Sequence, residues 1–155
     1  MMRGIARLET VPDHIREWAL GWWCRSGSHY RLEVGDDRVL LDALRVLLPA
    51  YDGPAVQLYR GDGARSRRGP SYGPAWSSER DVAEAHALGL WRGTPGGSVL
   101  LSTFAPAEAI MCNVGAHNND YGEDEYLVDR RRLGRVDVLN RYSQIDANAI
   151  ESDEL

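Results

Sequence analysis

The sequence predicts an α+β fold, in which helices come first along the chain and strands follow. Apolar residues recur at helical spacing in the N-terminal part, whereas short apolar runs rich in β-branched residues dominate after residue 98. A length of 155 residues is typical of one domain. We expect this domain to cover residues 1–145, with a helical part at 1–54, a core at 55–142 and an acidic tail at 146–155 that frays.

Two helices are predicted in the N-terminal part. The first runs from Val11 to Cys24 with its apolar residues at helical spacing, and Thr10 is placed to cap it. We interpret its tryptophans as core residues rather than as a stacking surface for an aromatic ligand. A polar stretch at 25–28 separates this helix from a second one, which is predicted over Asp36 to Leu48 and closed by Pro49.

The middle of the chain is predicted to contain a strand, a loop and a helix. Residues 55–60 alternate and are rich in strand formers, and Gly61 to Gly63 supply turn residues behind them. Glycine and proline are frequent over 61–75, which predicts a loop. A third helix is expected to start with Ser78 as its N-cap and to end before Gly93.

The second half of the chain is predicted to form four strands, at 98–104, 109–113, 125–128 and 135–139. Between the second and third strands lies a polar segment, 115–122, with glycine at both ends. We expect this segment to be a mobile loop that presents the acidic residues following it.

Composition and charge narrow the functions to consider. The formal net charge of −5, from 23 acidic and 18 basic residues, argues against nucleic-acid binding through a basic face. We see no signal-peptide core and no apolar run of about 20 residues, so we expect a cytoplasmic protein without membrane contacts, or one delivered to a target cell without a visible signal. Cys24 and Cys112 belong to no paired-cysteine motif and are predicted to be reduced core thiols.

The segment Glu123-Asp124-Glu125 is the most informative one, because it places two carboxylates at the start of a predicted strand. Residues i and i+2 of a strand share one face, so we expect Glu123 and Glu125 to lie side by side. Two upstream segments, Leu58-Tyr59-Arg60-Gly61 and Trp76-Ser77-Ser78, look suited to holding a substrate against them. Each motif is short, and a solvated acidic loop is the alternative interpretation of the two glutamates.

The order of these motifs resembles that of the mono-ADP-ribosyltransferases of the arginine, serine, glutamate (R-S-E) class. The resemblance covers roughly residues 55–142 and rests on Tyr59-Arg60-Gly61 on a strand, Trp76-Ser77-Ser78 at a helix start, Gly97 to Thr103 with Pro106 and Ile110, and Glu123 to Val128. It implies a core of two packed antiparallel sheets, preceded here by the N-terminal helices. It also implies that NAD is held in the cleft between the sheets.

The resemblance gives roles to the first two motifs. It implies that Arg60, between Tyr59 and Gly61, grips the NAD phosphate or the nicotinamide-side ribose, and a planar guanidinium suits phosphate. A strand-end arginine in a surface ion pair is the alternative. Trp76-Ser77-Ser78 matches the serine motif that supports the nicotinamide pocket. Because Ala75 stands where many relatives have serine, it is open whether Ser77 is the functional hydroxyl, and Ser78 could simply cap a helix.

Glu125 matches the family's position that hydrogen-bonds the ribose 2′-hydroxyl while the glycosidic bond breaks. A carboxylate there stabilises the oxocarbenium-like sugar, as in glycosidases. Glu123 matches the residue that orients or deprotonates the acceptor guanidinium in arginine-modifying members. The resemblance thus implies a glycosyltransferase that moves ADP-ribose from NAD to a protein, with arginine favoured as acceptor, in a toxin, effector or phage factor of bacterial or phage origin.

Two alternatives remain open: an NAD-hydrolysing toxin that uses water as acceptor, and a catalytically silent binding or inhibitor protein with the same fold. Tyr59, Tyr121 and Tyr126 are further candidates to stack on NAD, although core packing is the commoner role of such residues. His86 is expected not to be catalytic. No metal is expected, because the cluster from His117 to Asp120 has no second histidine or acid at ligand spacing.

Overall fold

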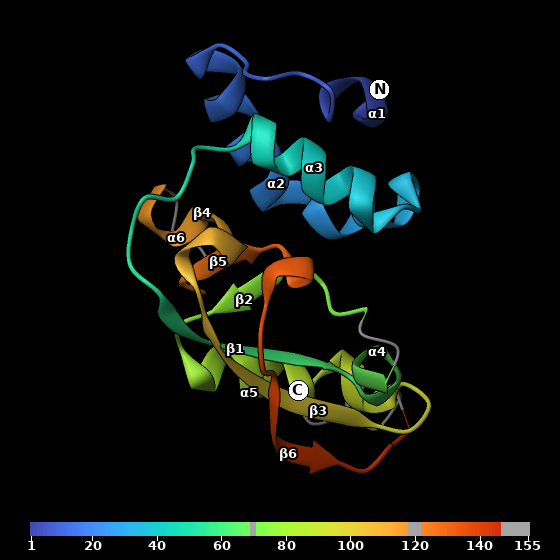
Figure 1. The fold of residues 1–155 in the computed structure, drawn as a ribbon. Helices are drawn as coiled ribbons and strands as arrows, with labels where there is room; N and C mark the ends of the chain where they lie inside the picture. Colours follow the sequence, from blue (N-terminus) through green and yellow to red (C-terminus); the bar gives the residue numbers. More distant parts are fainter. Residues whose placement is uncertain (69–70, 118–121, 147–155) are drawn as a thin grey trace.

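The computed structural model describes residues 1–68, 71–117 and 122–146 (Figure 1). Residues 147–155 of the predicted tail (146–155) and Tyr121 lie outside these residues. The helices are α1 (Met2–Ile5), α2 (Asp13–Val34), α3 (Asp37–Leu47), α4 (Ala64–Arg68), α5 (Arg80–Leu88) and α6 (Val114–His117), with short 3-10 turns η1 (Leu90–Gly93), η2 (Ala107–Ala109) and η3 (Arg130–Arg132). The strands are β1 (Val56–Gly63), β2 (Ala75–Ser77), β3 (Ser98–Ala105), β4 (Ile110–Asn113), β5 (Glu125–Val128) and β6 (Asp137–Tyr142).

The described strands form one antiparallel sheet in the order β4-β5-β2-β1-β3-β6. Strands β1 and β3 pair along their whole length, whereas β1 meets β2 only where Tyr59 lies opposite Ser77. The sheet therefore consists of two three-stranded halves joined at a narrow seam (Figure 1). The predicted α+β class and antiparallel pairing are confirmed, and the two expected sheets are hydrogen-bonded into one.

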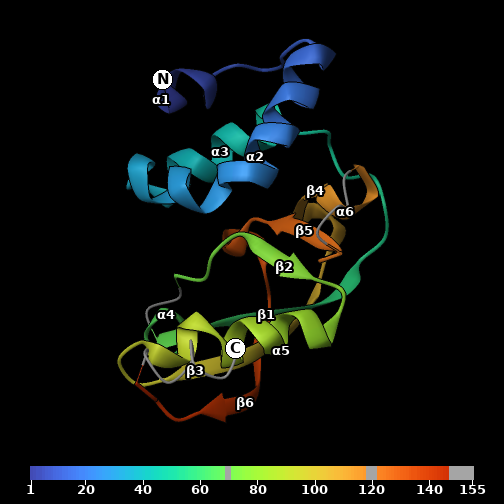
Figure 2. The ribbon, with the colours of Figure 1, turned by 180° about the vertical axis from the view of Figure 1, so that it is seen from behind.

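The two halves of the sheet pack against each other around a shared core. This core includes side chains of β1 and β3 from one half and of β2, β4 and β5 from the other, namely Leu58, Val99, Leu101, Trp76, Ile110 and Val128. A second core lies between the N-terminal helices and the half formed by β4, β5 and β2, and includes Leu20, Trp23, Leu44, Leu47, Met111 and Leu127. The two predicted N-terminal helices thus pack with their apolar faces on one half of the sheet. Figures 1 and 2 show α2 and α3 on the side of β4, β5 and β2.

Helix α2 continues well beyond the predicted range of 11–24, so the break expected in the following polar stretch is wrong. Gly27 lies one turn after Trp23, and a Cβ atom at Gly27 would approach the indole ring to 2.7 Å. The glycine therefore makes room for the ring instead of ending the helix. The helix ends at Gly35, whose left-handed φ of 66° allows its N–H to cap the last turn.

Three further predictions from local sequence are wrong. Gly61 to Gly63 form the end of β1 and not a turn, because α5 packs directly on Gly61. Figure 2 shows α5 beside β1. The helix predicted to start at Ser78 has Glu79 as its N-cap, and no side chain caps it. The segment 61–75, expected to be a loop, contains α4 and the beginning of β2 as well as the end of β1.

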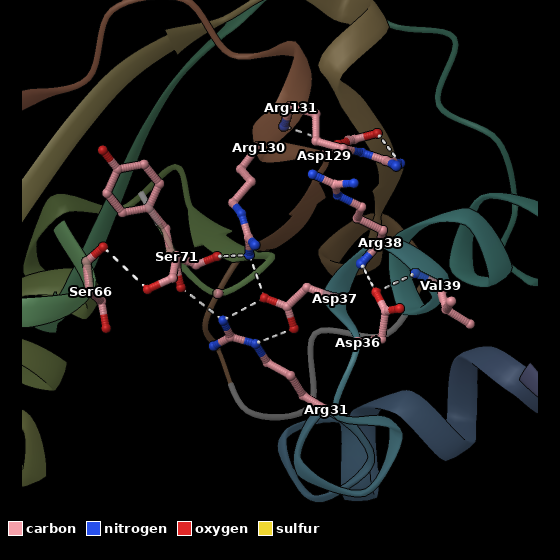
Figure 3. Close-up of polar contacts among 12 residues, drawn as sticks. Arg31, Asp36, Asp37, Arg38, Val39, Ser66, Ser71, Asp129, Arg130 and Arg131 are labelled. Atoms are coloured by element: carbon pink, nitrogen blue, oxygen red, sulfur yellow. Dashed lines mark hydrogen bonds and ion pairs between the residues drawn. The ribbon is translucent and has the colours of Figure 1, made fainter. Parts of the chain in front are cut away.

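Salt bridges fix the helical layer to the sheet (Figure 3). Asp37 at the start of α3 accepts hydrogen bonds from Nε and Nη2 of Arg31 on α2, at 3.2 and 3.0 Å, and from Arg130 of η3. Asp129, which is fully buried, accepts from Arg131 and from Arg45 of α3. Burial alone would raise the pKa of both carboxyls, but the hydrogen bonds from these arginines outweigh it and lower each pKa.

The contact between β1 and α5 gives a test of the fold. In a Gly61→Ala protein the new Cβ would overlap the Ala83 carbonyl and the Ala87 N–H of α5, and only movement of the helix could relieve the overlap. We expect a loss of about 1–3 kcal/mol in the free energy of unfolding, measured by urea denaturation. Gly134→Ala, where nothing lies within 4 Å of the added Cβ, is the matched control. Equal stabilities of the two variants would contradict the packing described here.

Candidate functional site

A cavity of about 640 Å³ lies between α2 and the sheet. Its lining includes Trp23, Arg25 and Arg31 of α2, Arg60 of β1, His86 of α5, Trp91 of η1, and the two acidic residues Glu123 and Glu125. A smaller hollow of about 40 Å³ shares Arg60, His86 and both glutamates with the cavity and adds Tyr59, Gly61, Trp76 and Ser77. The larger volume lies in the range, about 300–1,000 Å³, of pockets that enclose small organic ligands.

The central residues come from three neighbouring strands. Ser77 on β2 lies opposite Glu125 on β5 and opposite Tyr59 on β1, so these three residues form a row across the seam of the sheet. Arg60 follows Tyr59 and lines the cavity together with Glu125. The structure therefore brings together the arginine, the serine and the glutamate that the sequence singled out from separate segments.

Arg60 is held in place by its neighbours. Its Nε donates to Oδ2 of Asp62 at 2.7 Å, and its Nη1 donates to the carbonyl oxygen of Ala75 at 2.7 Å. The Arg60 side chain is 12% exposed. The ion pair is thus a buried one at the cavity wall, and not the surface ion pair considered as the alternative.

Glu125 is the first residue of β5 and is half-buried. Burial raises the pKa of Glu125 to about 7, and the nearby charge of Glu123 adds to this rise. A hydrogen bond from the Trp23 side chain and the charge of Arg60 act in the opposite direction on the pKa. Near neutral pH the Glu125 side chain can therefore both hold and release a proton, which is typical of groups at active sites.

Glu123 reaches the cavity by a route that the sequence did not predict. Strand β5 starts only at Glu125, and Asp124 has a φ of +43°, so the two glutamates do not share a strand face. Among the described residues other than glycine, Asp124 alone has a positive φ. The left-handed turn still places both glutamates on the cavity wall, and Oε1 of Glu123 lies 3.3 Å from Nε2 of His86.

Ser77 ties the strand β2 to the acidic segment. Its hydroxyl donates to the carbonyl oxygen of Glu123 at 2.6 Å and accepts from the backbone N–H of Glu79 at 3.0 Å. Ser78 contacts the same segment only through its backbone N–H, which lies 3.4 Å from the Asp124 carbonyl. Of the two serines, Ser77 is therefore the one whose hydroxyl is bonded within the site.

Several residues predicted to bind a ligand also have a packing role. Trp76 is buried and lies edge-on to Tyr72, with 6.2 Å between ring centroids. Gly61 packs on α5. Tyr126 lies edge-on to Tyr51 and does not line the cavity.

The site also contains residues whose contacts the sequence did not predict. Trp23 is a core residue, as predicted, but it also contacts Glu125. Asp62, read as part of a turn, is buried beside Arg60. His86, which was not expected to be catalytic, pairs with Glu123. Only the spacing of Arg60 and Asp62 along a strand could have indicated one of these contacts, since residues i and i+2 share a face.

The two cysteines differ in their surroundings. Neither forms a disulfide in the described part of the chain; Cys112 is buried, as predicted, whereas Cys24 is half-buried and lines the cavity. Burial, with the nearby charges of Glu125 and Cys24, raises the pKa of Cys112 to about 12. The Cys112 thiol is therefore protonated at neutral pH and is not a nucleophile of this site.

Searches for metal-ligand clusters and membrane spans gave nothing within the described ranges. Residues 1–68, 71–117 and 122–146 contain no group of three histidine, cysteine or acidic side chains arranged to hold a metal ion. In the same part of the chain, no helix has the length and apolar character that crossing a membrane requires.

Comparisons with known proteins gave no match: no family model fits the chain, and neither a curated protein nor a solved structure matches it. The chemistry of the site therefore has to be inferred from its own geometry.

The raised pKa of Glu125 predicts a pH-dependent effect on stability. The ordinary pKa of this carboxyl is 4.5, and in the folded protein it is about 7. At pH values between these two, the folded protein retains the Glu125 proton, whereas the unfolded chain has lost it. The stabilising contribution of the protonated carboxyl is therefore complete below pH 4.5 and is lost as the pH rises through 7. Since glutamine cannot ionise, we expect Glu125→Gln to increase the free energy of unfolding above pH 7 by an amount on the order of 1–3 kcal/mol.

Urea denaturation above pH 7 and below pH 4.5 checks this prediction, because the gain should disappear at the lower pH. Glu17→Gln, at an exposed position of α2, is the control and should change the stability by less than about 0.5 kcal/mol at either pH. An equal gain from Glu125→Gln at both pH values would show that the effect is not one of ionisation.

Proposed function

We propose that the protein is an NAD-dependent mono-ADP-ribosyltransferase that transfers ADP-ribose from NAD to a protein side chain and releases nicotinamide. One observation carries this proposal: Arg60, Ser77 and Glu125 come from three different strands and together line the smaller hollow, which shares Arg60 and Glu125 with the cavity. These are the three residue types, in the required order along the chain, that define the R-S-E class. Their convergence supports the resemblance that the sequence suggested.

The arrangement of the sheet also supports an ADP-ribosyltransferase-like core. Its two antiparallel halves pack around a shared apolar core, and the cavity opens where β1, β2 and β5 meet. The volume suits a dinucleotide, and the indoles of Trp23 and Trp91 on its wall can pack against a nicotinamide or adenine ring. The residues present therefore fit NAD as substrate.

Arg60 is proposed to bind a phosphate of NAD. Its side chain is already fixed by Asp62 and Ala75, and the N–H groups of Nη2 take no part in those two hydrogen bonds. A fixed guanidinium binds phosphate through paired, charge-assisted hydrogen bonds and loses little side-chain entropy in doing so.

Glu125 is proposed to hold the ribose 2′-hydroxyl. When the bond between ribose C1′ and nicotinamide breaks, nicotinamide leaves with the bonding electron pair and the sugar becomes oxocarbenium-like. The Glu125 carboxylate then accepts a stronger hydrogen bond from the 2′-hydroxyl as positive charge develops on the sugar. Ser77 supports this step by fixing the backbone at Glu123, two residues before the carboxylate.

Glu123 is proposed to receive the acceptor, and its position at the half-exposed edge of the cavity suits an approaching side chain. A lone pair of an arginine guanidinium nitrogen forms the new bond to C1′, and the proton that this nitrogen loses passes to the Glu123 carboxylate.

Hydrolysis of NAD would use the same pocket with water in place of the guanidinium. A silent binding protein with this fold would retain the pocket without turning NAD over.

The first test is nicotinamide release from NAD by the purified protein. Glu125→Gln should lower the rate by about 100-fold or more, because the amide cannot stabilise the developing charge. In the parent protein, the rate should rise with pH below about 7 and level off above it, since only the ionised carboxylate is active. No release from NAD, and no ADP-ribose mass shift on lysate proteins, would favour the silent binding protein.

A second test separates transfer from hydrolysis. With agmatine as a small guanidinium acceptor, Glu123→Gln should reduce ADP-ribosyl agmatine by about 100-fold and leave nicotinamide release in the absence of agmatine largely unchanged. Mass spectrometry measures the first product and chromatography the second. If both rates fall equally, Glu123 acts on NAD cleavage and not on the acceptor.

A further inference from the structure

Asp62 is a buried carboxylate that takes no direct part in the proposed reaction. It lies two residues after Arg60 on β1, is 1% exposed and is absent from the lining of the cavity. Burial of an unpaired carboxylate is strongly unfavourable, so such a group is retained only where it is bound by cations or N–H donors. The question is what the contacts of Asp62 achieve.

Both oxygens of Asp62 are engaged within the protein. Oδ2 accepts from Nε of Arg60 at 2.7 Å and from the backbone N–H of Gly73 at 3.5 Å, while Oδ1 accepts from the backbone N–H of Gly63 at 2.8 Å. Asp62 therefore links the end of β1, the 71–74 segment and the arginine that lines the cavity.

The remaining contacts of Arg60 leave its guanidinium one orientation. Nη1 donates to the Ala75 carbonyl, and the group packs so closely on Gly73 that a Cβ atom there would overlap Nη2 of Arg60 and would lie 3.1 Å from Nη1 of Arg31. Asp62 fixes the Nε edge, Ala75 fixes Nη1, and Gly73 makes room for Nη2. The guanidinium is thus held from the protein side while Arg60 lines the cavity.

We propose that Asp62 is a positioning residue that orients the Arg60 guanidinium to bind a phosphate group of the substrate. An arginine held in its binding orientation need not lose side-chain freedom when the ligand arrives, which increases affinity. The identity of the ligand as NAD rests on the proposed function, whereas the clamp on Arg60 does not.

The alternative is that Asp62 only stabilises the fold. Asp129 offers a matched control that distinguishes this role from the positioning of Arg60. Asp129 is also buried and is also bound by arginine, since Nε and Nη2 of Arg131 lie 2.9 Å from its oxygens. It does not line the cavity, and among the described residues its carboxylate pairs with Arg45, Arg131 and Arg132, whereas Arg60 pairs with Asp62. Loss of charge at either site should lower stability, but only loss at Asp62 should affect the ligand.

The affinity for NAD is measured by calorimetry in a Glu125→Gln background, so that NAD is not consumed. We expect Asp62→Asn to weaken NAD binding by about tenfold and Asp129→Asn to leave it within about twofold of the background protein. Gly73→Ala displaces the Arg60 guanidinium while retaining Asp62, so we expect it to weaken NAD binding by a similar factor. This variant replaces Asp62→Asn in the test if Asp62→Asn does not fold. Unchanged affinity in Asp62→Asn or in Gly73→Ala would overturn the proposal.

A second measurement is independent of NAD. In ¹⁵N NMR spectra of the parent protein, the Nε–H of Arg60, assigned by its loss in Arg60→Lys, should exchange with solvent far more slowly than that of the exposed Arg25. The exchange should become faster in Asp62→Asn and stay slow in Asp129→Asn. Fast exchange in the parent protein would overturn the clamp. If the background protein binds no NAD while Arg60 shows slow exchange that depends on Asp62, the proposed function fails and the clamp stands.

Discussion

The structure depends on the attachment of its helical layer to the sheet through carboxylates shared by arginines of different elements. Asp37 is bound by Arg31 of α2 and Arg130 of η3, and Asp129 joins α3 to η3 through Arg45 and Arg131. Apolar packing alone would allow the helices to shift on the sheet, whereas these directional contacts fix their position. Because α2 provides one wall of the cavity, the geometry of the site follows from the contacts of Asp37, which hold α2 through Arg31.

Within the site, identical functional groups behave differently because their partners differ. Asp62 has an arginine at 2.7 Å and two backbone N–H donors, so its charge is compensated inside the protein. Among the residues that the structure describes, Glu125 has no ion-pair partner of this kind: it receives a hydrogen bond from the Trp23 side chain and feels the charge of Arg60, while Glu123 repels it. The first arrangement holds a side chain still, and the second leaves a carboxyl able to change its protonation state at neutral pH.

The backbone around the acidic segment is also adapted to the site at some cost to stability. Asp124 takes a left-handed conformation, and Gly115 of α6 packs so closely that a Cβ atom there would lie 3.0 Å from the Asp124 Cα. The hydroxyl of Ser77 holds the same segment from the other side. Strained backbone persists only where surrounding contacts impose it, and such positions are frequent at functional sites.

Local periodicity and the order of the motifs predict the α+β class, three of the six described strands (β3, β4 and β5) to within a residue, and the residue types of the site. The sequence could not show that α2 continues through Gly27, since only the fit of the Trp23 ring decides that. Nor could it show that Asp62 lies beside Arg60 inside the protein, or that Glu123 turns toward His86. Tertiary structure decided these features, because burial and pairing depend on residues that are distant along the chain.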